Sequence, residues 1–253
     1  MTEKELQLLK KRLIELAEKS YSRGIYTYTP FLSLAEQQAF YAVEKEIAYA
    51  GYAMEGGAAD CERKMLRFGD KELIGYEEAY PITALEIVPL QLKFADELTH
   101  RDYLGALMNL GIERGMIGDL FPENTRCILF CQQVIAPYLM EQLYQVRHTR
   151  VKCRIITEKE PLAGKEPEEV VLTAVSTRVD SIVAKLYHIS RTKSQELFLA
   201  GRIYVNGIAM ESGSYQLKKD DTVTVRGYGR FICFGIIGEN KKGKERISIG
   251  VFR

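Results

Sequence analysis

The sequence predicts an α+β protein with three domains. A helix-rich α/β domain is expected first, then a ferredoxin-like (RRM-like) plait, then a small domain of two short helices and several strands. Residues 1–75 show helical apolar spacing, residues 76–157 show the element order βαββαβ, and residues 175–253 change from a helical period to strand alternation. Residues 158–174 carry two prolines and a glycine among glutamates, a composition typical of a linker.

Two helices and a glycine turn are predicted in the N-terminal domain. Residues 3–20 place leucine and isoleucine at helical spacing, and Ser33 with a glutamate three residues later forms the capping box of a second helix. Gly56-Gly57 indicates a tight turn. In the alternative interpretation, these glycines let the backbone approach a phosphate near Arg63.

The middle domain alternates strand and helix signals. Thr99 with an acidic residue three positions later starts one helix, which Gly111 ends, and Pro137 suits the first turn of another that extends to Val146. The four predicted strands are residues 82–88, 117–121, 126–131 and 151–156. The third strand lacks the glycine-aromatic signature that is expected of plaits that stack RNA bases, so the plait alone is weak evidence for RNA binding.

The C-terminal domain has sharp local signals. Residues 179–186 place four apolar side chains on one helical face, and a second helix is predicted to start near Ser190 or Thr192 and to stop at Gly201. Asn206-Gly207 between two short apolar runs predicts a two-residue hairpin. Further strands are expected toward the end of the chain.

Positive charge is concentrated in this domain. The chain carries 35 Lys and Arg against 34 Asp and Glu, but residues 176–253 hold 14 of the cations and 7 of the acids, which leaves 21 against 27 elsewhere. Arg191 and Lys193 lie in the first turn of the second helix, where the helix dipole is already positive. Cations there suit a bound phosphate, although two surface residues that tolerate a small penalty are an equal alternative. A basic end on an acidic remainder indicates nucleic-acid binding.

The order of residues between 178 and 231 resembles the RNA-binding module of small-subunit ribosomal protein S-four, also called the αL motif. Arg-Val-Asp, Ser-Arg before the second helix, Gly-Arg-Ile-Tyr-Val-Asn-Gly and Arg-Gly-Tyr-Gly-Arg-Phe follow one another at the expected spacing. Val179 departs from the usual leucine. The resemblance implies an αL RNA-binding domain with its RNA face on the two helices and the hairpin.

Over nearly its whole length the chain resembles the bacterial YlmH family. The shared features are Thr-Pro-Phe-Leu-Ser with a Gly-Gly…Glu-Arg-Lys stretch, the run Leu-Gly-Ile-Glu-Arg-Gly-Met-Ile-Gly-Asp-Leu at 110–120, and the αL module. The family implies a non-enzymatic, cytosolic protein that binds the large ribosomal subunit. It also implies stabilisation of peptidyl-tRNA in the P site during ribosome-associated quality control of stalled translation, and links to cell division are attributed to the family.

The RNA-binding residues follow from this resemblance. Phosphate contacts are expected from Arg178, Lys185, Arg191, Lys193, Arg202 and Arg230, and polar contacts to sugar or phosphate from Thr192, Gln195 and Asn206. Asp180 is expected to be a structural partner of a neighbouring basic side chain. The expected partners are the rRNA of the large subunit and a tRNA, and the expected state is a monomer.

Two other functions stay open on the sequence. The first is an RNA-modifying enzyme, of the pseudouridine synthase or methyltransferase type, that the C-terminal domain targets to RNA. A synthase would need an aspartate in a Gly-Arg-Leu-Asp setting, yet the similar string at 177–180 belongs to the αL module, and no glycine-rich cofactor loop follows a strand. The second is a cell-division adaptor protein for which RNA binding is incidental.

No cofactor or metal site is expected. The stretch 238–244 resembles a phosphate loop, but Glu245 stands where Ser or Thr would hold magnesium, so a hairpin with a basic tip is favoured. Five cysteines without a CxxC pair indicate reduced thiols. No run has the length of a membrane span and the charged N-terminus is unlike a signal peptide, so we expect a cytoplasmic protein without a membrane partner.

Overall fold

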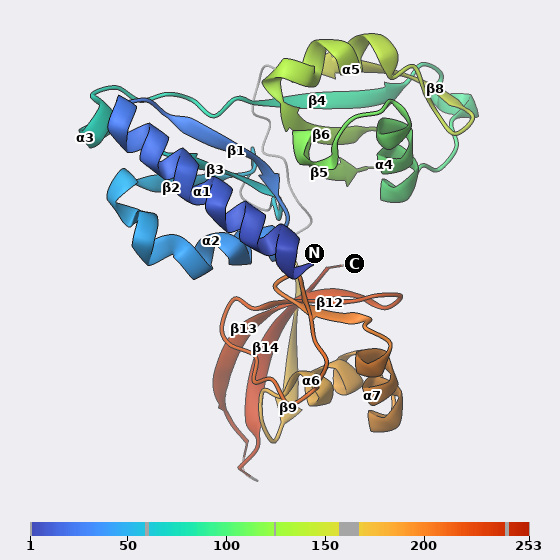
Figure 1. The fold of residues 1–253 in the computed structure, drawn as a ribbon. Helices are drawn as coiled ribbons and strands as arrows, with labels where there is room; N and C mark the ends of the chain where they lie inside the picture. The colour runs from blue at the N-terminus through green and yellow to red at the C-terminus, as the bar shows by residue number, and fades with distance from the viewer. Residues whose placement is uncertain (1, 59–60, 124, 157–166, 241–242, 253) are drawn as a thin grey trace. The chain divides into compact units, whose positions relative to one another are not determined.

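The chain folds into two compact units, residues 1–162 and 163–253. The computed structural model describes every residue except 1, 59–60, 124, 157–166, 241–242 and 253 (Figure 1). Each unit has its own hydrophobic core under its own sheets. Among the helices that are described, none is both long and apolar enough to cross a membrane.

The first unit opens with helices packed on a small antiparallel sheet of order β1-β3-β2. Its elements are α1 (Glu3–Arg23), β1 (Thr27–Leu32), α2 (Leu34–Ile47), β2 (Tyr52–Glu55), β3 (Lys64–Phe68) and α3 (Lys71–Ile74). Both long helices begin with capping boxes, at Thr2 and at Ser33, and the latter was predicted. Leu13, Phe40 and Phe68 are fully buried between the helices and the sheet.

The plait follows in the same unit and confirms the predicted order βαββαβ. Its strands and helices are β4 (Ile82–Pro89), α4 (His100–Asn109), β5 (Ile117–Pro122), β6 (Cys127–Gln132), α5 (Ala136–Gln142), β7 (Gln145–Val146) and β8 (Thr149–Ile155). The sheet order β5-β6-β4-β8-β7 is the ferredoxin-like arrangement with one short added strand. Both helices cover one face of this sheet (Figure 1).

The second helix of the plait is shorter than the sequence predicts. Apolar spacing favoured a helix from Pro137 to Val146, but α5 ends at Gln142 and Val146 pairs with Thr149 in a β7–β8 hairpin. Arg147, in the turn of this hairpin, has a φ of 51°. Val146 is fully buried in the core of the plait, as the predicted helix required, but the hairpin places it there instead of a helix.

The N-terminal part packs on the plait. One cluster of buried side chains contains Phe31 and Met65 from the N-terminal sheet together with Ile128 and Phe130 from β6. Gly57 lies so close to Phe130 that a Cβ atom would come within 2.3 Å of the ring. The predicted domains 1–75 and 76–157 are therefore two layers of one compact unit.

The second unit is a six-stranded antiparallel sheet of order β11-β10-β12-β13-β14-β9, with two helices over its core. Its elements are β9 (Glu168–Ala174), α6 (Val179–Leu186), α7 (Arg191–Leu199), β10 (Ile203–Val205), β11 (Ile208–Ala209), β12 (Thr222–Val225), β13 (Gly229–Glu239) and β14 (Glu245–Phe252). The Asn206-Gly207 hairpin is present, with a positive φ at both residues. β13 and β14 form the predicted hairpin, whose tip at 241–242 lies outside the described residues.

The predicted linker, 158–174, is wrong over its second part. Residues 168–174 form β9, which pairs with β14 along the strand, from Glu245 opposite Ala174 to Val251 opposite Glu168. Val170 and Leu172 alternate toward the core, and the neighbouring glutamates concealed this short signal. Residues 158–166 of the predicted linker lie outside the described residues.

Candidate nucleic-acid interface

The start of α7 displays polar and cationic side chains. Ser190 is the N-cap, and its Oγ accepts a hydrogen bond of 3.0 Å from the Lys193 N–H. The side chains of Arg191, Thr192 and Gln195 are exposed there. Helix N-termini attract anions through their free N–H groups and the helix dipole, so this turn has the chemistry of a phosphate-binding site.

Two further arginines follow α7 and β12 in the same unit. The chain leaves α7 through exposed Arg202 into β10, and Arg226 follows the paired strand β12 and donates its backbone N–H to the Arg202 carbonyl at 2.9 Å. The guanidinium of Arg226 lies 4.6 Å from the centre of the Tyr204 ring. We call Arg191, Lys193, Arg202 and Arg226 the C-terminal basic face.

Lys193 is held in place without losing its exposure. Its Nζ lies 2.8 Å from a carboxylate oxygen of Glu196, and this hydrogen bond and ion pair raise the pKa of Lys193. The positive charge of Arg202 opposes that rise. An exposed pair of this kind is weak and exchanges readily for a phosphate.

Two of the predicted phosphate contacts, Arg178 and Lys185, are engaged within the protein. Arg178 binds the Asp180 carboxylate through two hydrogen bonds of 3.1 and 2.7 Å, so Asp180 has the structural role that the sequence predicted. The Nζ of Lys185 donates to the Thr173 carbonyl on β9. Arg178 is partly exposed and Lys185 is exposed, but their hydrogen bonds are made within the second unit and stabilise it.

Asn206 and Arg230 also serve the fold. Asn206 has a φ of 50° in the hairpin turn, donates to Asp221 at 2.8 Å and accepts from the Thr222 N–H at 2.9 Å. Arg230 is partly buried, with its guanidinium 4.2 Å from the centre of the Phe252 ring, and burial lowers its pKa to about 10. The amide of Asn206 is therefore occupied, and Arg230 lies against the sheet.

Sequence reasoning missed two exposed residues of this site, Arg226 and Tyr228. Tyr228 lies in the turn between β12 and β13, with its ring 5.4 Å from that of Tyr187. Arg226 and Tyr228 both belong to the motif Arg-Gly-Tyr-Gly-Arg-Phe, which is plain in the sequence. An exposed tyrosine beside cations is suited to stack on a base.

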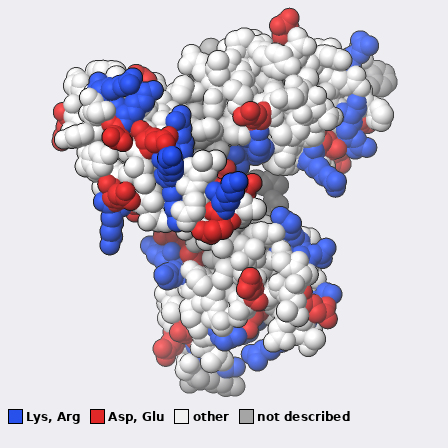
Figure 2. Space-filling model, viewed as in Figure 1, with Lys and Arg blue, Asp and Glu red and all other residues white. Residues whose placement is uncertain are grey.

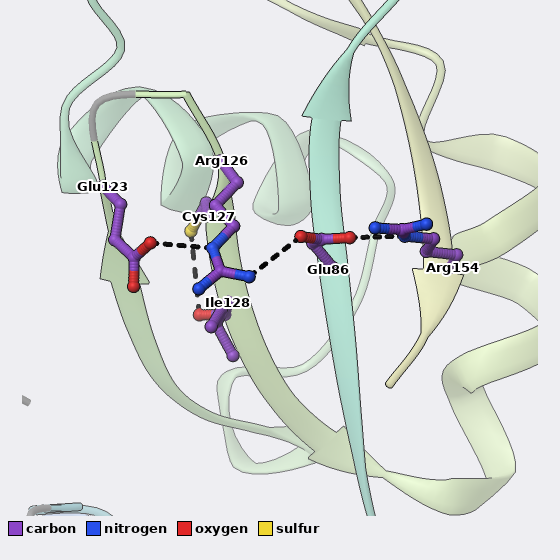
Figure 3. A network of polar contacts seen from close by, with 6 residues as sticks. All are labelled: Glu86, Glu123, Arg126, Cys127, Ile128 and Arg154. Atoms are coloured by element: carbon purple, nitrogen blue, oxygen red, sulfur yellow. Dashed lines mark hydrogen bonds and ion pairs between the residues drawn. The ribbon is translucent and has the colours of Figure 1, made fainter. Parts of the chain in front are cut away.

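A second group of cations lies on the face of the plait that its helices do not cover. Glu86 on β4 stands between Arg126 and Arg154 (Figure 3). Arg126 reaches Glu86 at 3.2 Å and Glu123 at 2.7 Å, and the Nε of Arg154 donates to the other oxygen of Glu86. Burial acts to raise the pKa of Glu86, but the two arginines outweigh it, so the pKa lies below its ordinary value.

The two stretches typical of the family outside the αL module meet at the joint between the N-terminal part and the plait. Arg63 donates its backbone N–H to Asp119 at 2.9 Å and its guanidinium to the carbonyls of Ile117 and Phe31. Arg114 likewise donates to the Gly118 carbonyl at 3.1 Å, and burial lowers its pKa to about 10. These arginines bind backbone carbonyls, so the alternative of a phosphate near Arg63 is not supported.

Comparisons with known proteins agree with this geometry. A family model described as "Putative RNA-binding domain in YlmH" matches residues 76–160, and a second one, described as "S4 domain", matches residues 177–223. The chain is 30% identical over 228 residues to "Ribosome-associated protein quality control protein P2" of Bacillus subtilis (strain 168), which spans 87% of this chain and 85% of the relative.

Two further similarities are more limited. "Small ribosomal subunit protein uS4" of Fervidobacterium nodosum is 25% identical over 111 residues, covering 44% of this chain and 52% of the relative. A solved structure, "Cell division protein ylmH from Streptococcus pneumoniae", has a TM-score of 0.48 at 19% identity and covers 62% of this chain and 93% of that chain. The similarity to the Bacillus subtilis protein extends across both compact units, and with the two matching domains it shows that this chain belongs to the YlmH family.

Proposed function

We propose that this protein is a non-enzymatic RNA-binding factor that binds the large ribosomal subunit, through rRNA and a P-site tRNA, in the quality control of stalled translation. The observation that carries the proposal is the C-terminal basic face. Arg191 and Lys193 are exposed in the first turn of α7, the positive end of the helix, and Arg202 is exposed just after its last turn, so this face attracts anions.

The chemistry of this face favours the RNA backbone over base edges. Guanidinium and ammonium groups bind phosphate strongly, and Thr192 and Gln195 add hydroxyl and amide groups that bind sugar or phosphate oxygens. Tyr228 adds a stacking surface for one unpaired base. We infer a target that is recognised by its shape, such as a folded rRNA helix.

The relatives support the ribosome as the place of action. The Bacillus subtilis relative is named for ribosome-associated quality control, and a ribosomal protein shares similarity with part of this chain. Two compact units, each with a matching RNA-binding domain, suit a target made of two RNAs, an rRNA and a tRNA. The protein would act as a monomer in the cytoplasm.

Co-sedimentation with purified bacterial large subunits across a salt series tests this assignment. Arg191→Glu with Lys193→Glu removes two cations whose side chains have no buried contact to lose. Each lost phosphate contact lowers the slope of log affinity against log salt by about 0.7 to 0.9, so the double variant is expected to lower it by about 1.4 to 1.8 and to release the protein at moderate salt.

Lys218→Glu with Lys219→Glu is the matched control. These lysines are exposed in the same unit but precede β12, whereas Arg226 follows that strand. The control is expected to bind nearly as the wild type does. Equal binding by wild type and the Arg191/Lys193 variant would exclude this face as the ribosome contact.

The non-enzymatic part of the proposal has a separate test. Mass spectrometry of rRNA from a strain without this protein is expected to show the full set of nucleotide modifications. One missing modification, restored when the gene is returned, would identify the protein as a modifying enzyme instead.

A further inference from the structure

The helix-free face of the plait is divided between two environments. Its β6 side, with Ile128 and Phe130 at 1% and 2% exposure, lies under the N-terminal part. In many plaits the central strands of this face stack RNA bases. Here those positions are covered, whereas the β8 side of the face carries exposed side chains among the residues that the structure describes.

The open side carries a row of cations. Along β8, Val151 and Cys153 point into the core, and Arg150, Lys152 and Arg154 alternate with them on the helix-free face. We call these three residues the β8 stripe. Strand residues two apart are about 6.8 Å apart, so the stripe is about 13 Å long. In a duplex, one strand carries a charge about every 3.4 Å of the helix axis, so the stripe spans the axial rise of a few successive phosphates.

The neighbouring strand β4 pairs with one of these three cations, Arg154, and leaves the other two without an acidic partner. Lys152 is opposite Val88 on β4, and Arg154 is opposite Glu86, which Arg126 also neutralises. Among the described residues, Arg150 and Lys152 take part in no ion pair or side-chain hydrogen bond. Figure 2 shows Lys and Arg also near α4, on the helix-covered side of the plait, although the first unit as a whole is acidic.

We propose that the β8 stripe is a second RNA-binding site, which holds the phosphates of one RNA strand along β8. The inference rests on the proposed function, since it assigns a separate contact surface within the same RNA-binding protein. The stripe binds by charge and spacing, because the aromatic position Phe130 is covered and Val88 and Pro89 offer no donor toward base edges. It is therefore indifferent to base sequence.

The test is fluorescence anisotropy with a short, mixed-sequence, fluorescein-labelled RNA strand and the full chain across a salt series. The variant is Arg150→Gln with Lys152→Gln, which leaves the Arg154–Glu86 pair in place. Two lost phosphate contacts on single-stranded RNA are expected to lower the salt slope by about 1.4 and the affinity on the order of tenfold at 0.1 M salt.

The matched control is Lys4→Gln with Lys19→Gln, which removes two exposed charges from α1 of the same unit. It is expected to change the slope by much less, and equal melting curves for all variants show that the fold is kept. If the Arg150/Lys152 variant binds the labelled RNA as the wild type or the control does, the inference is overturned, whatever the large-subunit experiment shows. If the salt slope of the Arg150/Lys152 variant decreases while the Arg191/Lys193 variant still binds large subunits, the β8 stripe is supported and the proposed ribosome contact is excluded.

Discussion

Phe130→Ala tests whether the N-terminal part and the plait are one cooperative unit. Phe130 lies on the helix-free face of β6, where a plait with an open face would expose an aromatic residue to RNA. Instead it is 2% exposed, its ring centre lies 6.1 Å from that of Phe121, and Gly57 packs directly against it. The substitution would therefore damage the joint between the two layers.

The cost follows from the buried area. A buried aromatic side chain removes roughly 200 Å² from water, which at about 25 cal/mol per Å² is worth about 5 kcal/mol. A compact unfolded chain reduces this value by about 10–40%, which leaves about 3–4.5 kcal/mol, within the range for Phe→Ala in protein cores. An exposed aromatic at the same position would cost less than about 0.5 kcal/mol.

The buried cysteines report where the unfolding occurs. Cys61 lies in the N-terminal part, Cys127 in the plait and Cys233 in the second unit, and all three are free and buried. Pulsed thiol labelling across a urea series, read by mass spectrometry, gives an unfolding midpoint at each site. With m of about 2 kcal/mol per M, Phe130→Ala is expected to lower the Cys61 and Cys127 midpoints together by about 1.5–2.3 M.

The internal reference is Cys233, whose midpoint is expected to stay unchanged. Tyr144→Ala removes an aromatic side chain of the plait that is 68% exposed and serves as the matched substitution, with an expected cost below about 0.5 kcal/mol. Separate midpoints for Cys61 and Cys127 in the wild type, or a small shift in Phe130→Ala, would refute the reasoning.

Two further substitutions test single polar sites. Glu86→Gln removes a charge whose folded-state pKa lies below its ordinary value of 4.5, so the stability that it contributes is present above that pH and is lost as the pH falls through the folded pKa. We expect the free energy of unfolding in urea to fall by only about 1–2 kcal/mol at pH 7, because one arginine partner is 67% exposed to solvent. In acid this difference is expected to vanish. A difference that persists in acid would contradict an electrostatic cause. Asn206→Ala removes two hydrogen bonds, one of them to Asp221, and strains a turn at φ 50°, so we expect a loss of about 1–3 kcal/mol at the Cys233 probe, whereas unchanged stability would show that the hairpin does not depend on this amide.

The sequence predicts the elements of this protein where local signals suffice. The Thr99 capping box, the Ser190 cap and the Asn206-Gly207 turn each depend on residues a few positions apart, and each is present. β9 was missed because its stability comes from pairing with β14, a contact that no local pattern encodes. Val146 was predicted to be helical for a similar reason, since apolar spacing alone does not show whether a buried residue reaches the core from a helix or from a strand.

The candidate site was predictable in its chemistry more than in its geometry. The first turn of α7 stood out because Arg191 and Lys193 oppose the helix dipole. The partner of Arg178, Asp180, is two residues away and was expected from the sequence, whereas the partner of Asn206, Asp221, is brought near only by the sheet. The cover over Phe130 is also tertiary, although the alternation of cations along β8 was visible in the sequence.

The position of β14 has a consequence for synthesis of the chain on the ribosome. β14 lies between β13 and β9, so β9 has no sheet partner until the intervening helices and strands have been translated. At about 5–20 residues per second, some seventy residues take roughly 4–14 s. During that time Val170 and Leu172 are an open strand edge in a nascent chain, and the adjacent Glu168 and Glu169 place negative charges that disfavour pairing with other chains.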